Sequence, residues 1–317
     1  MTPPPDDAQH DEPETKPPSG LLKALPFVLF ALTVATTTGV PMFFNGHPLP
    51  QALAFSVPLM TILLAHEFGH YIAARIHRVP ASLPYFVPLP LPPLGTMGAV
   101  ILMPGEIKSR NALLDIGAAG PLAGLVVALP VLAYGIITSP IQRLPETGGY
   151  VAEGHSLLYA GMLYALKGPI AEGYDIFLSP TAFAGWAGLL VTMLNLIPSL
   201  QLDGGHVAHA LLGDRQERIS RLVRKLLFPL AIGVALYYGG AAFLRGVRGE
   251  ALLSESGVGL QWLLWAGLLR WMAGNSEREH PATEGEPLSP RRKWIARLTL
   301  GLFVLLFMPA WMRNVAG

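Results

Sequence analysis

The pentapeptide HEFGH at residues 66–70 carries the side chains of a metal-assisted hydrolase. On a helix, His66 and His70 are four positions apart and project from one face, so both imidazoles can bind one ion. Glu67 then lies close enough to take a proton from water on that ion. Glu67 is also the first charged residue after Lys23, and an ionisable cluster inside an apolar span is functional by default. The alternative is a structural His/Glu cluster between helices.

Asp203 is the candidate for the third protein ligand that a zinc site needs, beside an open position for water. It follows a charge-free run over 176–202 and precedes two glycines, which permit a break that frees its carboxylate. The alternative is an aspartate that caps the next helix. Asn195 lies upstream in an apolar span, where its amide must hydrogen-bond. It could hold substrate backbone or an oxyanion, or bond to another helix.

Four segments, taken in order, resemble the site-2 protease family of intramembrane zinc metalloproteases: HEFGH at 66–70, GAVI at 98–101, GAAGPLAG at 117–124 and NLIPSLQLDGG at 195–205. The resemblance covers residues 50–210 approximately. It implies one Zn²⁺ ion bound by His66, His70 and Asp203. It also implies Glu67 as the general base and Asn195 in substrate binding or oxyanion stabilisation.

The resemblance further implies a transmembrane protein as substrate, such as a single-span regulator that is released by regulated intramembrane proteolysis. Many family members carry a PDZ or CBS domain, for which this chain has no room, so the compact form is expected.

The composition is that of a membrane protein, because 51% of the residues are hydrophobic and 14% are charged, against ~25% charged in soluble domains. Several charge-free runs exceed the ~20 residues that cross a bilayer. We expect an all-α multi-pass protein with about seven transmembrane helices, near 24–45, 50–74, 112–138, 178–200, 226–244, 257–273 and 294–312. Residues 1–20 are acidic and Pro-rich and predict a disordered tail. Residues 21–317 predict one membrane-embedded metalloprotease domain with its catalytic core at about 50–210.

Residues 79–105 are uncharged yet crowded with proline, which forbids a regular helix. Non-helical backbone at membrane depth is tolerated against protein or a water-filled cavity. We therefore expect a membrane-dipping loop or β-hairpin between the second and third spans. Gly98, Ala99, Val100 and Ile101 suit a short strand that could bind an unwound substrate by strand addition. The alternative is an apolar loop on the membrane surface.

Arg and Lys residues gather in the connections after the second, fourth and sixth spans, which predicts that these connections are cytoplasmic. The N-terminus and the opening of the active site are then cytoplasmic, and a bacterial cytoplasmic membrane is expected. A net charge of +1 provides no field to attract nucleic acid. The expected partners are membrane lipid and the substrate. Since the chain has no cysteine, a metal would bind His, Asp or Glu.

Two other classes of protein remain as alternatives. An ion transporter could use the His/Glu/Asp cluster as its ion path, but it predicts matching broken helices in two halves, which the sequence does not show. A non-catalytic scaffold would often lose the glutamate or a ligand, and all are present here. The contribution of His206 and His209 stays open, with packing on a helix face as the favoured role.

Overall fold

The computed structural model describes residues 20–104, 107–145, 149–274, 280 and 287–316. The tail expected over 1–20 lies, except for Gly20, outside the described residues. The long helices of the first half are α1 (Gly20–Asn45), α2 (Leu49–Ile76) and α3 (Arg110–Thr138). Shorter helices follow: α4 (Leu157–Lys167), α5 (Pro180–Asn195) and α6 (Asp203–Leu212). The last third holds α7 (Arg215–Leu244), α8 (Gly249–Ser256), a 3₁₀ turn (Gly257–Gly259), α9 (Leu260–Ala273) and α10 (Pro290–Leu306).

Four helices in the described part of the chain are long and apolar enough to cross a membrane: Lys23–Asn45, Leu49–Ile76, Arg110–Thr138 and Arg215–Leu244. The protein is thus a mostly helical integral membrane protein. The three other expected spans contain α5, α9 and α10, which have 16, 14 and 17 residues. At 1.5 Å per residue these helices are about 21–26 Å long, shorter than the ~30 Å hydrocarbon core. The total of seven spans therefore stays a prediction.

Helix α7 begins earlier than the sequence predicts. We expected a span at 226–244 after an Arg-rich cytoplasmic connection, but the helix starts at Arg215. The charges in residues 215–225 exclude this segment from a span that is predicted by charge-free length. Arg, Lys and Leu are nevertheless all good helix formers. The basic segment is therefore the first part of α7.

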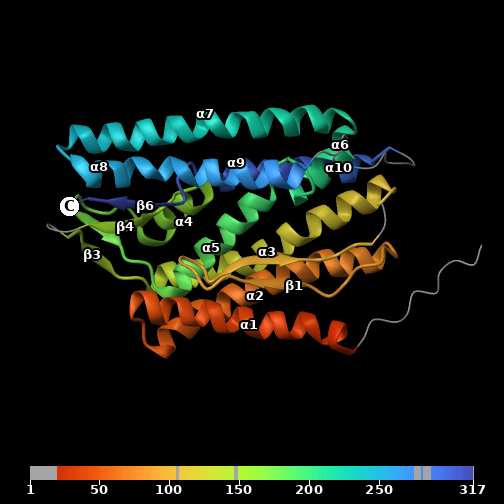
Figure 1. Cartoon of the computed structure of the whole chain (residues 1–317), viewed down its shortest axis with the longest axis horizontal. Helices are drawn as coiled ribbons and strands as arrows, with labels where there is room; N and C mark the ends of the chain where they lie inside the picture. The colour runs from red at the N-terminus through yellow and green to blue at the C-terminus, as the bar shows by residue number, and fades with distance from the viewer. Residues whose placement is uncertain (1–19, 105–106, 146–148, 275–279, 281–286, 317) are drawn as a thin grey trace, which may run out of the picture.

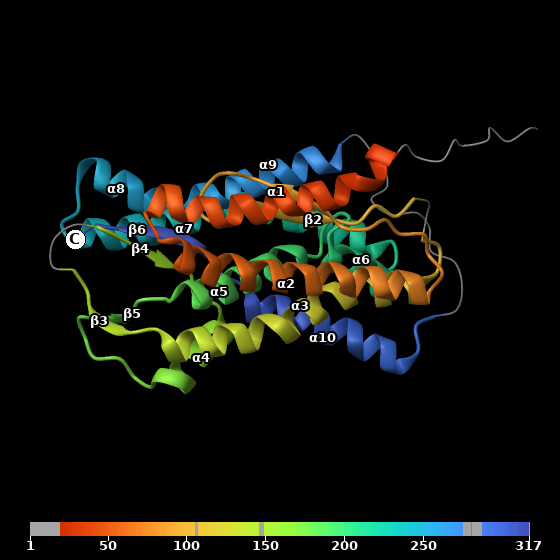
Figure 2. The same ribbon diagram turned by 90° about the horizontal axis from the view of Figure 1, so that it is seen from below.

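Helices α2, α3 and α5 pack together in the middle of the molecule (Figure 1), between α1 on one side and α7 and α9 on the other. The view from below shows α2 running along α3 and past α5 (Figure 2). Large side chains on these three helices, among them Leu59, Leu132 and Trp186, are fully buried. Helix α5 begins where Ser179 Oγ accepts the amide of Ala182, as an N-cap should.

The strands form three two-stranded sheets. β1 (Tyr85–Pro88) and β2 (Thr96–Val100) pair antiparallel and run beside α1 and α2 (Figure 1). β3 (Ile141–Arg143) pairs with β5 (Tyr174–Ile176), and β4 (Tyr150–Glu153) pairs with β6 (Met312–Val315). These last two sheets lie together at one end of the molecule (Figure 1).

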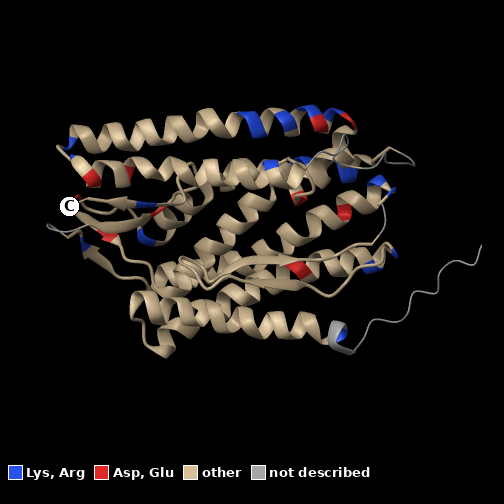
Figure 3. Ribbon diagram, in the orientation of Figure 1, with Lys and Arg blue, Asp and Glu red and all other residues tan. Residues whose placement is uncertain are grey.

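The opposite end of the molecule is basic. Lys and Arg residues gather where α2 ends and where α3, α7 and α10 begin (Figure 3). The basic residues by which the sequence assigned three connections to one side of the membrane thus lie at one end of the structure, called here the basic end. The end with the β3–β5 and β4–β6 sheets carries charges of both signs (Figure 3).

Candidate metal centre

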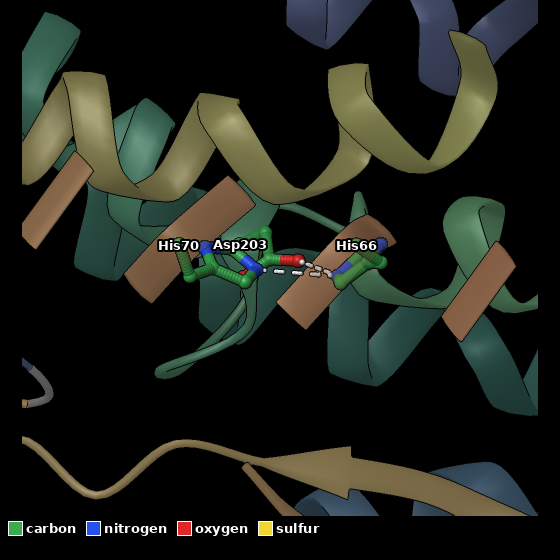
Figure 4. A group of neighbouring side chains, drawn as sticks. All are labelled: His66, His70 and Asp203. Carbon is green, nitrogen blue, oxygen red and sulfur yellow. Dashed lines mark hydrogen bonds and ion pairs between the residues drawn. The ribbon is translucent and has the colours of Figure 1, made fainter. Parts of the chain in front are cut away.

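Three side chains from two distant segments converge (Figure 4). His66 and His70 project from one face of α2, and their Nε2 atoms are 3.2 Å apart. Asp203 is the first residue of α6. Its Oδ2 lies 3.1 Å from His66 Nε2 and its Oδ1 lies 3.3 Å from His70 Nε2. One ligand atom from each residue lies within 4.8 Å of the other two, so the group could hold a metal ion.

The donor set fits a zinc ion. With zinc–ligand bonds of about 2.0–2.1 Å, neighbouring donors of a tetrahedral site are ~3.3 Å apart, close to the distances above. The Nδ1 atom of His70 lies 2.8 Å from the Ile116 carbonyl oxygen. A carbonyl only accepts, so Nδ1 must carry the proton and Nε2 keeps its lone pair for a metal. Two nitrogens and a carboxylate are a usual zinc set with a position left open for water.

Two glycines of α3 make room for the imidazoles. A Cβ at Gly120 would lie 2.0 Å from His70 Nε2, and a Cβ at Gly124 would lie 3.3 Å from His66 Nδ1. These glycines were not among the site residues predicted from the sequence. Their spacing is the sequence signal that could have identified them, because Gly117, Gly120 and Gly124 share one face of a helix.

Glu67 and Asn195 border the three converging side chains. Glu67 lies on α2 between the two histidines and is 7% exposed. Asn195 is the last residue of α5, and its Nδ2 donates towards His66 Nε2 over 3.4 Å. The segment NLIPSLQLDGG holds both the end of α5 and the start of α6, so it brings Asn195 and Asp203 to the same histidine.

His206 and His209 do not join the three donors among the described residues. His206 Nδ1 lies 3.1 Å from Nε2 of His280, and the His209 ring stacks on the His280 ring at 4.6 Å. Burial lowers the pKa of His280 to about 3, so at neutral pH its bond to His206 joins two neutral imidazoles. These two residues of α6 thus pack against His280.

Helices long and apolar enough to span a membrane, together with two buried histidines that meet Asp203, define a membrane-embedded metalloprotein. The model of peptidase family M50 matches residues 54–238, which is more than half of the chain. The chain belongs to peptidase family M50, and the predicted resemblance to site-2 proteases is confirmed.

Several curated relatives bear names of zinc proteases. The probable zinc metalloprotease EGY2, chloroplastic, of Oryza sativa subsp. indica is 33% identical over 184 residues, which are 57% of this chain and 32% of that protein. The probable zinc metalloprotease EGY1, chloroplastic, of Arabidopsis thaliana is 32% identical over 169 residues, covering 51% and 30%. The Arabidopsis probable zinc metallopeptidase EGY3, chloroplastic, is 27% identical over 270 residues, covering 76% and 45%.

The chain therefore spans about a third of the length of the first two relatives. No solved structure matches it. The relatives are named as chloroplast proteins, so the comparisons give no support to the expected bacterial cytoplasmic membrane.

Proposed function

We propose that this protein is an intramembrane zinc metalloprotease that hydrolyses peptide bonds within or next to transmembrane segments of membrane proteins. The observation that carries the proposal is that Asp203 of α6 meets His66 and His70 of α2, a helix long and apolar enough to cross a membrane. Membership of peptidase family M50 and the names of the relatives support the same reaction.

The side chains at the centre divide the work of peptide hydrolysis. A zinc ion held by His66, His70 and Asp203 would act as a Lewis acid and would lower the pKa of a bound water. Glu67 takes the proton of the attacking water and delivers it to the leaving amine. The Asn195 amide donates a hydrogen bond to the carbonyl oxygen as negative charge develops there.

The substrate is a transmembrane protein, such as a single-span regulator, whose helix unwinds locally to expose a carbonyl. Strand β2 contacts α2, and a hairpin strand passes below the three side chains in Figure 4. Within the described residues only β1 pairs with β2, so its other edge has no strand partner. Gly98, Ala99 and Val100 lie on this edge, and Ile101 directly follows it; the backbone of these four residues replaces the hydrogen bonds that the substrate helix loses.

The basic end faces the cytoplasm in this proposal, as Lys- and Arg-rich connections do. His70 precedes the end of α2 by six residues, about 9 Å of helix. Water therefore has a short path to the centre from the cytoplasmic side, and lipid surrounds the outer helices.

The decisive experiment compares zinc content and cleavage of a panel of transmembrane peptides by detergent-purified wild type and Glu67→Gln. We expect about one bound zinc in both and at least ~100-fold slower cleavage by the variant, since general base catalysis contributes that much. Glu250→Gln, on exposed α8 at the other end, is the matched control. Zinc-free wild type prepared without chelators, or equal cleavage by Glu67→Gln, would contradict the proposal.

A further inference from the structure

Asp115 of α3 joins three helices at the basic end. Arg292 of α10 donates from Nε to Asp115 Oδ1 over 3.2 Å and from Nη2 to Oδ2 over 2.7 Å. His77, which caps the C-terminus of α2, lies with Nε2 2.8 Å from the same Oδ2. The carboxylate accepts all three hydrogen bonds, so one side chain links the ends of α2, α3 and α10.

This junction lies next to the bond that orients a metal donor. Ile116 follows Asp115 in the chain, and its carbonyl accepts the Nδ1 proton of His70. His77 follows His70 by seven residues, which is two turns along the same face of α2. Helix α2 therefore contacts α3 at two successive points, His70 with Ile116 and His77 with Asp115.

Helix α10 also packs against the helix that carries the third donor. Ala296 of α10 lies in one apolar cluster with Leu114 of α3 and Val207 of α6. Helix α6 begins at Asp203. Arg292 lies beyond residues 54–238, the segment that matches the family. Helix α10 lies outside that segment, and it packs against α3 and α6, the two helices next to the histidines.

We propose that Asp115, Arg292 and His77 are positioning residues for the metal centre. They hold α3 in register with α2, so that the Ile116 carbonyl keeps His70 Nε2 directed at the ion. The two-point bond between a guanidinium and a carboxylate fixes direction as well as distance. A partly exposed ion pair adds little to stability alone, whereas groups that orient a metal-binding histidine change metal affinity by ~10–100-fold. The inference rests on the proposed zinc centre.

The test uses the full chain in detergent and measures zinc affinity by competition with a chelator. Asp115→Asn and Arg292→Gln are expected to weaken zinc binding by ~10–100-fold. They should also alter the visible absorption spectrum of the Co²⁺-substituted protein, which reports ligand geometry. Arg292→Lys keeps the charge without the planar fork and should recover part of the affinity. Arg291→Gln removes the neighbouring, exposed charge on α10 and should match wild type.

Wild-type zinc affinity and cobalt spectrum in Arg292→Gln and Asp115→Asn would overturn the inference, even if the zinc-free variants unfolded at a lower temperature. That result would leave the junction with a structural role alone. Should Arg292→Gln fail to fold, Arg292→Lys and Asp115→Asn decide, and wild-type values in both would overturn the inference. If wild type binds no zinc, the proposed function fails first, and this outcome is distinct from tight binding in every variant.

Discussion

At the scale of single residues, the metal centre depends on glycines, which have no side chain, as much as on the side chains that converge there. Gly120 and Gly124 leave the space that the imidazoles of His70 and His66 occupy. The Ile116 carbonyl then selects the tautomer of His70. Helix α3 therefore shapes the centre without supplying a donor atom to the ion.

Gly120→Ala tests this dependence on space. The new Cβ would lie 2.0 Å from His70 Nε2, so the imidazole must move away from the other donors. We expect zinc affinity to fall at least ~10-fold, as when the support of a metal-binding histidine is lost, measured by chelator competition. Gly267→Ala on α9 is the control, because a Cβ there meets nothing within 4 Å. Equal zinc affinity in the two variants would contradict this account of the centre.

The sequence alone predicted the three side chains that converge, but not the residues that position them. HEFGH predicts that His66 and His70 share a face, because local helix geometry determines it. A single charge after a long apolar run singled out Asp203. Gly120 and the Ile116 carbonyl depend on the register between α2 and α3. Hydropathy does not encode that register, so these contacts could not be predicted from charge-free length.

At the scale of elements, charge-free length predicted the long helices within a few residues. The expected span at 50–74 is helix Leu49–Ile76, and the one at 112–138 is Arg110–Thr138. The start of α7 was missed because basic residues there are helical. Proline density excluded a helix before α3, and β1 and β2 occupy that segment.

Proline at Ile101 tests the proposed strand addition. Ile101 directly follows β2, and proline there removes a backbone donor. We expect Ile101→Pro to reduce cleavage of transmembrane peptides by at least ~10-fold, the loss of one or two backbone hydrogen bonds, while zinc content stays at the wild-type level. Ile101→Ala serves as the control for the lost side chain. Unchanged cleavage by the proline variant would exclude this edge as the substrate strand.

At the scale of the whole molecule, the position of the basic residues and the length of α7 support the proposed orientation in the bilayer. Helix α7 has 30 residues, about 45 Å of helix, which is longer than the ~30 Å hydrocarbon core. Its basic first turns can therefore extend into the headgroups, where Lys and Arg bind anionic lipid. The metal centre lies near that same end.

Labelling of single cysteines tests the orientation, and the chain has no cysteine of its own. Arg218→Cys lies exposed in the basic first turns of α7, and Glu172→Cys lies exposed before β5. In sealed right-side-out vesicles, a membrane-impermeant maleimide should label position 172 and leave position 218 unlabelled. Inverted vesicles should give the opposite pattern. Labelling of position 218 from the outside would reverse the proposed orientation.

The distance along the chain between the donors has a consequence for biosynthesis. His66 and Asp203 are 137 residues apart, on the order of ten seconds of translation. The histidines enter the membrane long before the carboxylate exists, and metal affinity appears only once α6 has packed. A ribosome-bound, half-inserted chain therefore has no complete centre. A chain that is still being made therefore cannot bind the ion with all three donors until Asp203 has been added and α6 has packed.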